Sequence, residues 1–302
     1  RQSYGMLTIG HVPFLWVLLF YFMTGLWIWK KNGQNRHIRI SLAYVIMIIL
    51  IWIPMARRKS LAFLDVGQGD CFVADTKSGA IIFDGGSSSE DQVGRYRILP
   101  YMKYLGYQKI QIAVISHMDI DHYSGIKELL EMGKIKYLGL PEIPKDETMK
   151  KIIGIAKKRG TTIFYLSRGR QITTKDGSLK VLHPQKNSQM EKNAASLVMQ
   201  GKILGYRVLL TGDVEKEGEE ELLSEELERA DILKAAHHGS KNSTSNEFLQ
   251  KVQPKQTVIS CGKQNRYGHP HLETIHRLQT YHTKIYRTDR SGAIIFFKRR
   301  DG

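Results

Sequence analysis

The sequence predicts an α/β protein of the αββα type, in which two β-sheets lie between layers of helices, preceded by a hairpin of two transmembrane helices. Two observations predict the sandwich: short β-branched strands alternate with stretches of helical spacing, and this alternation occurs in both halves of the chain. A third predicts the hairpin, because two long apolar runs precede the first strand. We therefore expect a membrane segment over residues 1–59 and a folded domain over residues 60–302.

The two apolar runs are Val12–Trp29 and Ile38–Met55, and Arg39 is the one charged residue in either. Each run has about 18 residues, which is within the range for a transmembrane helix. Neither run has a polar face, so two buried core helices fit this pattern less well. Basic residues are similar in number in the loop between the two runs and in the segment after the second run, so they leave the orientation of the hairpin undecided. Since the chain opens on Arg1 rather than Met, we expect further spans upstream.

Each predicted element of the folded domain is a short apolar strand between glycine-containing turns or a helix with periodic apolar residues. The first half has predicted elements at residues 61–66, 71–74, 80–83, 94–105, 112–115, 136–140, 149–158 and 162–165, with a further helix after His122. The second half has them at residues 179–182, 196–199, 207–210, 232–235, 248–252 and 258–260, with a helix that runs to Arg229.

The strongest chemical signal is the stretch 116–122, which follows the apolar run 111–115 directly. This position is a strand-to-helix loop at the carboxyl end of a strand, where open α/β sheets place their ligands. Burial of two imidazoles and two carboxylates has a large desolvation cost, which a divalent cation offsets by coordination. A solvated polar loop is the alternative. The residues concerned are His117, Asp119, Asp121 and His122.

Further polar side chains end later strands, and they would converge on this loop if the strands are neighbours. They are Asp213, the tandem pair His237 and His238, and a glycine-rich loop, residues 261–271, with Lys263, His269 and His271. A two-metal hydrolytic centre needs cations about 3.5 to 4 Å apart, a bridging carboxylate and a shared water.

The spacing of these residues and their positions at strand ends suggest a role for each in such a centre. Asp213 is the best candidate for the bridging carboxylate. His117 and Asp119 would face one metal, while Asp121 and His122 would face the other, completed by His237 or His238. The predicted metal ligands are therefore His117, Asp119, Asp121, His122, Asp213, His237 and His238, and the predicted catalytic residues are Asp121, Asp213, His238, His269 and Lys263.

Other polar residues near these motifs have structural explanations. Asp65 and Asp70 bracket a tight glycine turn, where a turn role and hydrogen bonding to metal ligands are equally compatible with the pattern. Asp84, before Gly85 and Gly86, is predicted to support a ligand or a turn rather than to bind metal. His183 ends a strand and is predicted to be structural rather than to contact substrate.

The formal net charge of +16, with a pI near 9.7, favours a polyanionic partner, either nucleic acid or an anionic lipid surface. Basic residues near the loops that would frame a phosphate-tracking groove are Arg168, Arg170, Lys241, Lys263 and Arg266. A generally basic solvated surface fits the composition equally well. The two cysteines, Cys71 and Cys261, exclude a disulfide framework and a zinc finger.

Taken in order, six motifs resemble the metallo-β-lactamase-like domain of the ComEC family of competence proteins, from about Leu61 to the end of the chain. They lie at residues 65–70, 83–86, 116–122, 211–213, 237–240 and 268–271. The two apolar runs resemble the last helices of that family's membrane channel. The resemblance implies a hydrolase in a multi-pass cell-membrane protein, on the extracellular face, which degrades the DNA strand that is not imported. The implied partners are DNA, bound without sequence preference, the upstream channel and other competence proteins.

The sequence departs from the broader metallo-β-lactamase superfamily at two positions. That superfamily has histidine where Asp119 stands, although the ComEC family shares the aspartate, and a further histidine where this chain offers Asn193. Oxygen ligands favour Mn²⁺ or Mg²⁺ relative to Zn²⁺. We expect two divalent ions, Mn²⁺ or Zn²⁺, with Mg²⁺ as an alternative. Two other functions fit: a non-catalytic module that guides or gates DNA with a degenerate metal site, and a hydrolase of small esters or lactones.

Overall fold

The computed structural model describes residues 8, 10–29, 38, 41–46, 58–190, 193–225 and 227–299. The chain divides into two compact units. One consists of Arg1–Arg57 with Met102–Gln108, and the other of Arg58–Tyr101 with Lys109–Gly302. The second unit contains both β-sheets and every predicted site residue.

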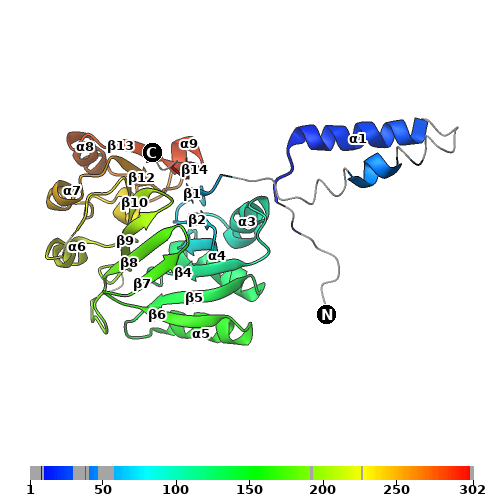
Figure 1. Cartoon of the computed structure of the whole chain (residues 1–302). Helices are drawn as coiled ribbons and strands as arrows, with labels where there is room; N and C mark the ends of the chain where they lie inside the picture. The colour runs from blue at the N-terminus through cyan, green and yellow to red at the C-terminus, as the bar shows by residue number, and fades with distance from the viewer. Residues whose placement is uncertain are drawn as a thin grey trace. The chain divides into compact units, whose positions relative to one another are not determined.

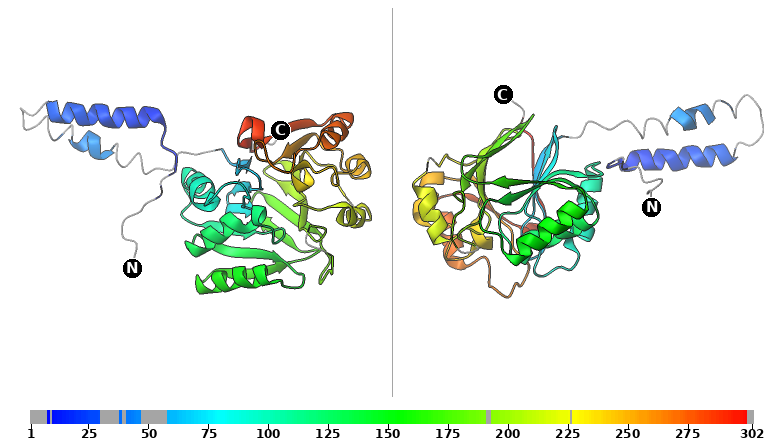
Figure 2. Two further views of the ribbon diagram at one scale, coloured as in Figure 1. Left: turned by 180° about the vertical axis from the view of Figure 1, so that it is seen from behind. Right: turned by 90° about the horizontal axis from the view of Figure 1, so that it is seen from below.

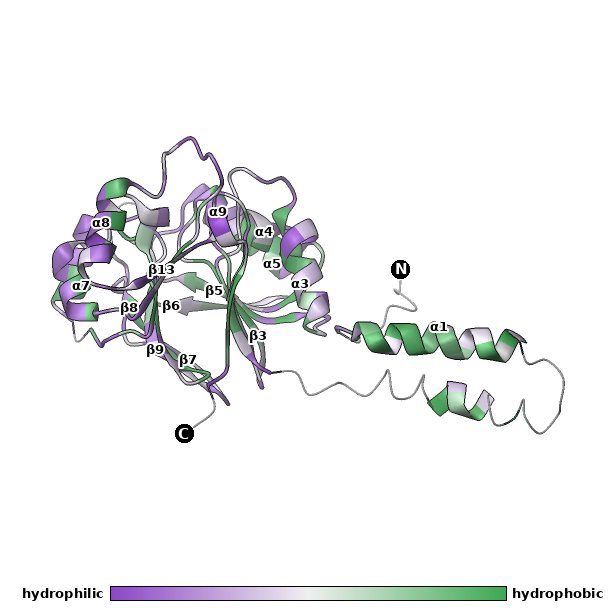
Figure 3. Ribbon diagram, turned by 90° about the horizontal axis from the view of Figure 1, so that it is seen from above, coloured by the Kyte–Doolittle hydropathy of each residue, from purple (hydrophilic) through white to green (hydrophobic). Residues whose placement is uncertain are grey.

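The first unit contains α1 (Phe14–Trp29), a helix of 16 residues without a charged side chain. Its ribbon is hydrophobic over most of its length, whereas α5, α7 and α8 of the second unit carry both hydrophobic and hydrophilic residues (Figure 3). α1 lies within the first predicted span. Of the second predicted span, positions 38 and 41–46 are described and helical, and the rest lies outside the described residues. No helix in the described part of the chain has both the length and the apolar character to cross a membrane.

The first sheet has the strand order β14-β1-β2-β3-β4-β5-β6. Strands β14, β1, β2 and β3 pair in antiparallel fashion, and β3 to β6 are parallel. Parallel neighbours require crossover connections, and two of these contain α4 (Ile120–Glu131) and α5 (Glu147–Lys158). The strands are β1 (Ser60–Phe63), β2 (Phe72–Thr76), β3 (Gly79–Phe83), β4 (Ile110–Val114), β5 (Ile135–Pro141), β6 (Thr162–Leu166) and β14 (Ile294–Phe297).

The second sheet repeats this plan, with the order β13-β12-β11-β10-β9-β8-β7. Strands β7 to β10 are antiparallel and β10 to β13 are parallel. Its strands are β7 (Gln171–Thr174), β8 (Gly177–His183), β9 (Val198–Ile203), β10 (Tyr206–Leu210), β11 (Ile232–Lys234), β12 (Gln256–Ile259) and β13 (Lys284–Arg287). The helices that follow the later strands are α6 (Lys216–Leu223), α7 (Asn246–Val252) and α8 (Leu272–Thr280).

The two sheets stack with helices on their outer faces, α4 and α5 on one side and α6 to α8 on the other (Figures 1 and 2). A single apolar cluster joins the facing sides of the sheets and includes Phe63, Ile81, Leu210 and Val258. A second cluster, with Leu233, packs the other face of the second sheet against its helices. Fully burying each such side chain contributes about 1.5–3 kcal/mol. The predicted αββα sandwich is confirmed.

Several elements differ from the sequence prediction. The helix predicted to reach Arg229 ends at Leu223, with Ser224 as its C-cap. Strands β7, β13 and β14 and helix α8 were not among the predicted elements. β7 and β13 are short, half-polar strands at sheet edges, so they lack the apolar run that predicts a strand. β14 has the apolar sequence typical of a strand, which the prediction overlooked, and it pairs with β1 from Phe297 opposite Ser60 to Ile294 opposite Phe63.

Candidate metal centre

The loop after β4 is held in place by a buried aspartate. Asp84 follows β3, adopts a left-handed backbone conformation, and accepts a hydrogen bond from Ser116 N at 2.7 Å. Its other oxygen lies 2.9 Å from His122 Nδ1. A Cβ on Gly86 would lie 2.5 Å from His122 N, so glycine is needed for this close backbone approach. Asp84 thus directs His122 Nε2 away from itself, the supporting role predicted for it.

Four buried side chains form the centre of the site. The potential ligand atoms of Asp70, His122, Asp213 and His238 all lie within 4.8 Å of one another. Asp213 Oδ2 lies 3.2 Å from His122 Nε2 and 3.3 Å from His238 Nε2. Among the residues that the structure describes, no other group of three or more His, Cys, Asp or Glu side chains lies this close together. Three of its members, His122, Asp213 and His238, are among the predicted metal ligands. The fourth member, Asp70, is not.

The tandem histidines take different places because the backbone turns sharply between them. Both have positive φ, 46° at His237 and 52° at His238, in a conformation that non-glycine residues rarely adopt. His238 Nδ1 donates to Ser260 O at 2.9 Å, so its Nε2 faces Asp213. His237 is less buried, and its Nδ1 lies 2.8 Å from Glu215 Oε1. His238 therefore belongs to the four-residue group and His237 lies at its edge.

The buried lysine Lys234 is a member of the site that the sequence analysis missed. Its Nζ donates to Gly212 O at 2.8 Å, lies 3.4 Å from Asp213 Oδ1 and forms an ion pair with Asp70. These carboxylates raise the pKa of Lys234 although burial opposes it. The available signal was a lysine within the apolar strand Ile232–Lys234, because a lysine is almost never fully buried without a partner.

The charges of this region show an excess of buried carboxylate. Burial opposes ionisation of Asp121, but its close contact with His238 and the charges of His122 and His238 lower its pKa to about 2. Burial also opposes protonation of His238, yet Asp213 and Asp70 raise its pKa to about 10. Without a metal ion, the carboxylates therefore hold protons on the imidazoles. A cation would replace those protons.

The unsatisfied atoms fit a metal ion. His122 Nε2 and His238 Nε2 are buried and have no hydrogen-bond partner, and the same is true of His117 Nε2. Such orphaned polar atoms are rare in native proteins. Two imidazole nitrogens and two carboxylates suit a divalent ion of intermediate hardness, such as Mn²⁺ or Zn²⁺. The residues present therefore fit the ion that the sequence predicts.

The other predicted ligands surround this group. Asp121 Oδ2 lies 3.3 Å from His238 Nε2. The His117 ring centroid lies 4.1 Å from that of His122, and His117 Nε2 lies 3.7 Å from Asp119 Oδ2. His117 and Asp119 thus lie together beside the four-residue group, where the sequence analysis expects the first of two metals. Asn193 belongs to the adjoining loop, which pairs with this one through Leu197 N and Ser116 O.

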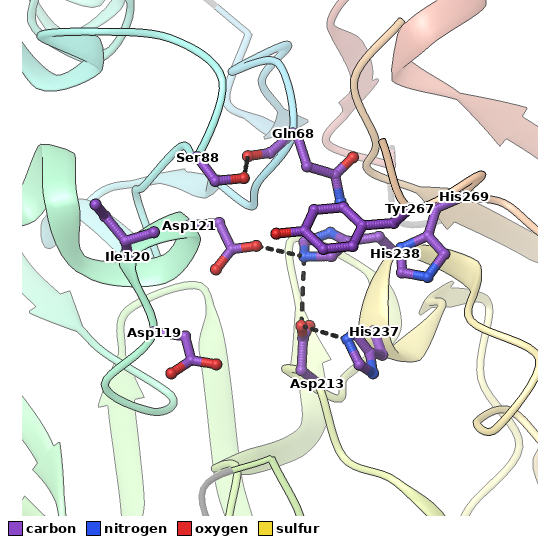
Figure 4. A pocket seen from close by; sticks show the side chains of 10 residues that line it. All are labelled: Gln68, Ser88, Asp119, Ile120, Asp121, Asp213, His237, His238, Tyr267 and His269. Atoms are coloured by element: carbon purple, nitrogen blue, oxygen red, sulfur yellow. Dashed lines mark hydrogen bonds and ion pairs between the residues drawn. The ribbon is translucent and has the colours of Figure 1, made fainter. Parts of the chain in front are cut away.

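A cavity of about 250 Å³ opens above Asp121, Asp213 and His238. Figure 4 shows Asp121, Asp213 and His237 grouped around His238, with Asp119 on one wall and His269 and Tyr267 on another. Tyr267 was not predicted, although an exposed aromatic residue in a glycine-rich loop is a recognisable signal. The cavity gives a ligand direct access to the predicted metal ligands.

Two predicted catalytic residues lie in the loop over this cavity. His269 lines it and stacks on Tyr267 at 5.7 Å between ring centroids. Burial and the charges of His238 and His237 lower the pKa of His269 to about 4, so its ring is neutral at pH 7. Lys263 is exposed and is not among the residues that line the cavity. Of the basic residues predicted near the site, Arg168 instead binds Glu221 and Glu225 at 2.9 and 2.7 Å.

Comparisons with known proteins place this geometry in a family. Residues 64–263 match the Metallo-beta-lactamase superfamily. The chain is 35% identical over 294 residues to the ComE operon protein 3 of Bacillus subtilis, covering 90% of the chain and 38% of that protein. It is 30% identical over 248 residues to the competence protein ComA of Neisseria gonorrhoeae, covering 79% and 32%. The chain therefore spans about a third of the length of these relatives, which confirm the resemblance predicted from the motifs.

Solved structures show the same fold at low sequence identity. The metallo-beta-lactamase fold protein YhfI from Bacillus subtilis has a TM-score of 0.54 and 12% identity, over 78% of this chain and 99% of that chain. CmlA, a diiron beta-hydroxylase from Streptomyces venezuelae, has a TM-score of 0.50 and 11% identity, over 87% and 59%. At such identities the likeness concerns the fold alone.

Proposed function

Since this chain belongs to the metallo-β-lactamase superfamily, we propose that it is a metal-dependent phosphodiesterase that hydrolyses DNA during competence DNA uptake. The observation that carries the proposal is the buried group Asp70, His122, Asp213 and His238, which lies beside a cavity open to a ligand. The basic balance of the chain suits a polyanionic substrate, and contacts to the phosphate backbone carry no base information. Hydrolysis would therefore be independent of sequence.

In this proposal the four-residue group holds one divalent ion, with Asp121 at its edge, and His117 and Asp119 contribute to a second. Bound metal ions supply Lewis acidity and lower the pKa of a bound water to about 7. The chain itself fixes the geometry. Asp84 and Ser260 O hold the two imidazoles, so that the Nε2 atoms of His122 and His238 face Asp213.

The residues that line the cavity would act on the substrate and the water. Asp121, with its pKa of about 2, is ionised at neutral pH and accepts hydrogen bonds. Neutral His269 can donate a hydrogen bond to a phosphate oxygen and, unlike an imidazolium, it can also accept a proton. Lys234, 3.4 Å from Asp213 Oδ1, offsets part of the carboxylate charge that would otherwise repel a phosphodiester.

The proposal includes a membrane anchor formed by the apolar runs Val12–Trp29 and Ile38–Met55, with the hydrolase domain on the extracellular face. In α1, large apolar side chains are exposed, 72% at Phe14, 74% at Leu15 and 62% at Phe22. An exposed apolar surface of this kind marks a site of contact with protein or membrane, and the acyl chains of lipids suit its composition. Protease treatment of intact cells that carry an epitope-tagged chain tests the orientation: we expect loss of the hydrolase domain, and full protection would contradict the proposed face.

The nuclease proposal is tested with the purified chain, Mn²⁺ and end-labelled single- and double-stranded DNA. We expect cleavage that stops on chelation and in Asp121→Ala. The matched control is Asp91→Ala, an exposed carboxylate that is not among the residues lining the cavity, which should cleave normally. DNA left intact by the wild-type chain, together with DNA binding that survives chelation, would instead favour a module that guides DNA without cutting it.

A further inference from the structure

A second cavity, of about 200 Å³, has His117 among its lining residues. Its walls are mostly apolar. Three thioethers and two aliphatic groups contribute to them: Met118, Met149, Met190, Ile143 and Pro144. Thioethers are polarisable and make favourable contacts with aromatic rings. The cavity is therefore suited to a flat, weakly polar group.

The charge of this cavity excludes the phosphate group as its occupant. No lysine or arginine is among the described residues that line it, and the one carboxylate there belongs to Asp146. Asp146 caps α5 by accepting a hydrogen bond from Met149 N at 2.7 Å. Ser188, Gln189 and the imidazole of His117 supply the remaining polar groups. An anion would meet no counter-charge from these side chains.

His117 connects the two places. It lines this second cavity, its ring centroid lies 4.1 Å from that of His122, and its buried Nε2 has no hydrogen-bond partner. A polymer with a charged group at the metal centre would therefore bring its adjacent neutral group to the second cavity. In a nucleic-acid strand the neutral, flat group next to each phosphodiester is the base.

We propose that this methionine-lined cavity binds one unpaired nucleobase of a nucleic-acid strand whose neighbouring phosphodiester lies at the metal centre. The inference rests on the proposed function and names its substrate more closely. A base held in a duplex cannot enter such a cavity without leaving the stack. The substrate is thus single-stranded or frayed nucleic acid. Apolar walls recognise the π-face that all bases share, so the cavity adds strand selectivity without sequence selectivity.

The test compares binding of two fluorescent oligonucleotides of equal length, one of thymidylate and one abasic, to the full 302-residue chain with Mn²⁺. Both strands carry phosphorothioate linkages, which resist hydrolysis. The variant is Met118→Ala with Met190→Ala, two half-buried residues whose replacement should leave the fold intact. We expect about fivefold weaker binding of the thymidylate, from the loss of two sulfur contacts, and no change for the abasic strand. The matched control is Met132→Ala, a half-buried methionine that is not among the lining residues.

Each outcome has a definite meaning. Wild-type chain that binds the two strands equally, or a variant that weakens both alike, overturns the base site. Because binding is measured without hydrolysis, the base site and the nuclease can fail separately. A chain that prefers the base-bearing strand yet cleaves no DNA with Mn²⁺ retains the base site and refutes the nuclease. A chain that cleaves DNA but shows no preference for the base-bearing strand retains the nuclease and refutes the base site.

Discussion

The two ends of the β-sandwich both bury carboxylates, but they pair them differently. At the end formed by the hairpin turns, Asp176 accepts a hydrogen bond from Lys77 N at 2.6 Å and pairs with Lys298 Nζ at 3.1 Å. At the other end, Asp70 and Asp213 share the single ammonium of Lys234 and face two imidazoles whose Nε2 atoms have no hydrogen-bond partner. The first arrangement is saturated and ties the two sheets together. The second is unsaturated, and it is therefore suited to binding.

The largest effect is expected from Lys234→Met, which removes the cation from the unsaturated end. Asp70 and Asp213 would lose the one ammonium group that they share, and removing one partner of a buried ion pair costs about 3–5 kcal/mol. We expect that loss in the free energy of unfolding, measured by denaturant titration in EDTA. Lys298→Met at the saturated end is the matched comparison, and an equal loss there would remove the distinction between the two ends.

Asp213→Asn sharpens the comparison through activity. The carboxylate lies between His122 Nε2 and His238 Nε2, so its loss should remove metal binding and reduce DNA cleavage about 10²–10³-fold. Metal content by elemental analysis and cleavage rates with Mn²⁺ measure the two effects. The control is Glu217→Gln, which alters an exposed carboxylate four residues after Asp213 and should change neither the metal content nor the cleavage rate. Full activity in Asp213→Asn would contradict the proposed centre.

Added Mn²⁺ should stabilise the wild-type chain. A ligand that binds only the folded state at 100 times its Kd adds about 2.7 kcal/mol to the free energy of unfolding. Thermal unfolding with and without the ion measures this gain. The gain should persist in Asp176→Asn and vanish in His122→Ala, because only the second variant alters the unsaturated end. A similar gain in both variants would indicate binding elsewhere.

The smallest effect is expected from Asp176→Asn. Burial opposes ionisation of this carboxyl group, but Lys77 N and Lys298 outweigh it and lower the pKa. The contribution to stability is then present above the ordinary aspartate pKa of about 3.9 and is lost as pH falls through the lower folded value. We expect a loss of about 1.5–3 kcal/mol at neutral pH.

The pH dependence provides the check on Asp176. Denaturant unfolding at neutral pH and at successively lower values below about pH 4 should show the difference between wild type and Asp176→Asn shrinking. Asp91→Asn, at an exposed position, should match wild type throughout. A difference that stays constant down to low pH would mean that Asp176 acts through packing rather than through its charge.

The fold class and the ligand-rich loop could be predicted from the residues alone, because both depend on local pattern. Alternating apolar strands and helices report on neighbours in the chain, and His117, Asp119, Asp121 and His122 lie within six residues. The carboxyl ends of strands also marked Asp213 and the tandem histidines. These groups could be predicted because parallel strands bring their ends to one edge.

Long-range packing sets which of these side chains lie in contact, and the sequence pattern does not predict it. The roles of Asp70 and Lys234 depend on the packing of the first sheet against the second, and this packing cannot be predicted from a local sequence pattern. The choice of His238 over His237 depends on two left-handed residues and on the hydrogen bond to Ser260 O. A metal centre needs atoms placed within a few ångströms, and such placement follows from long-range strand pairing and backbone dihedral angles rather than from residue type.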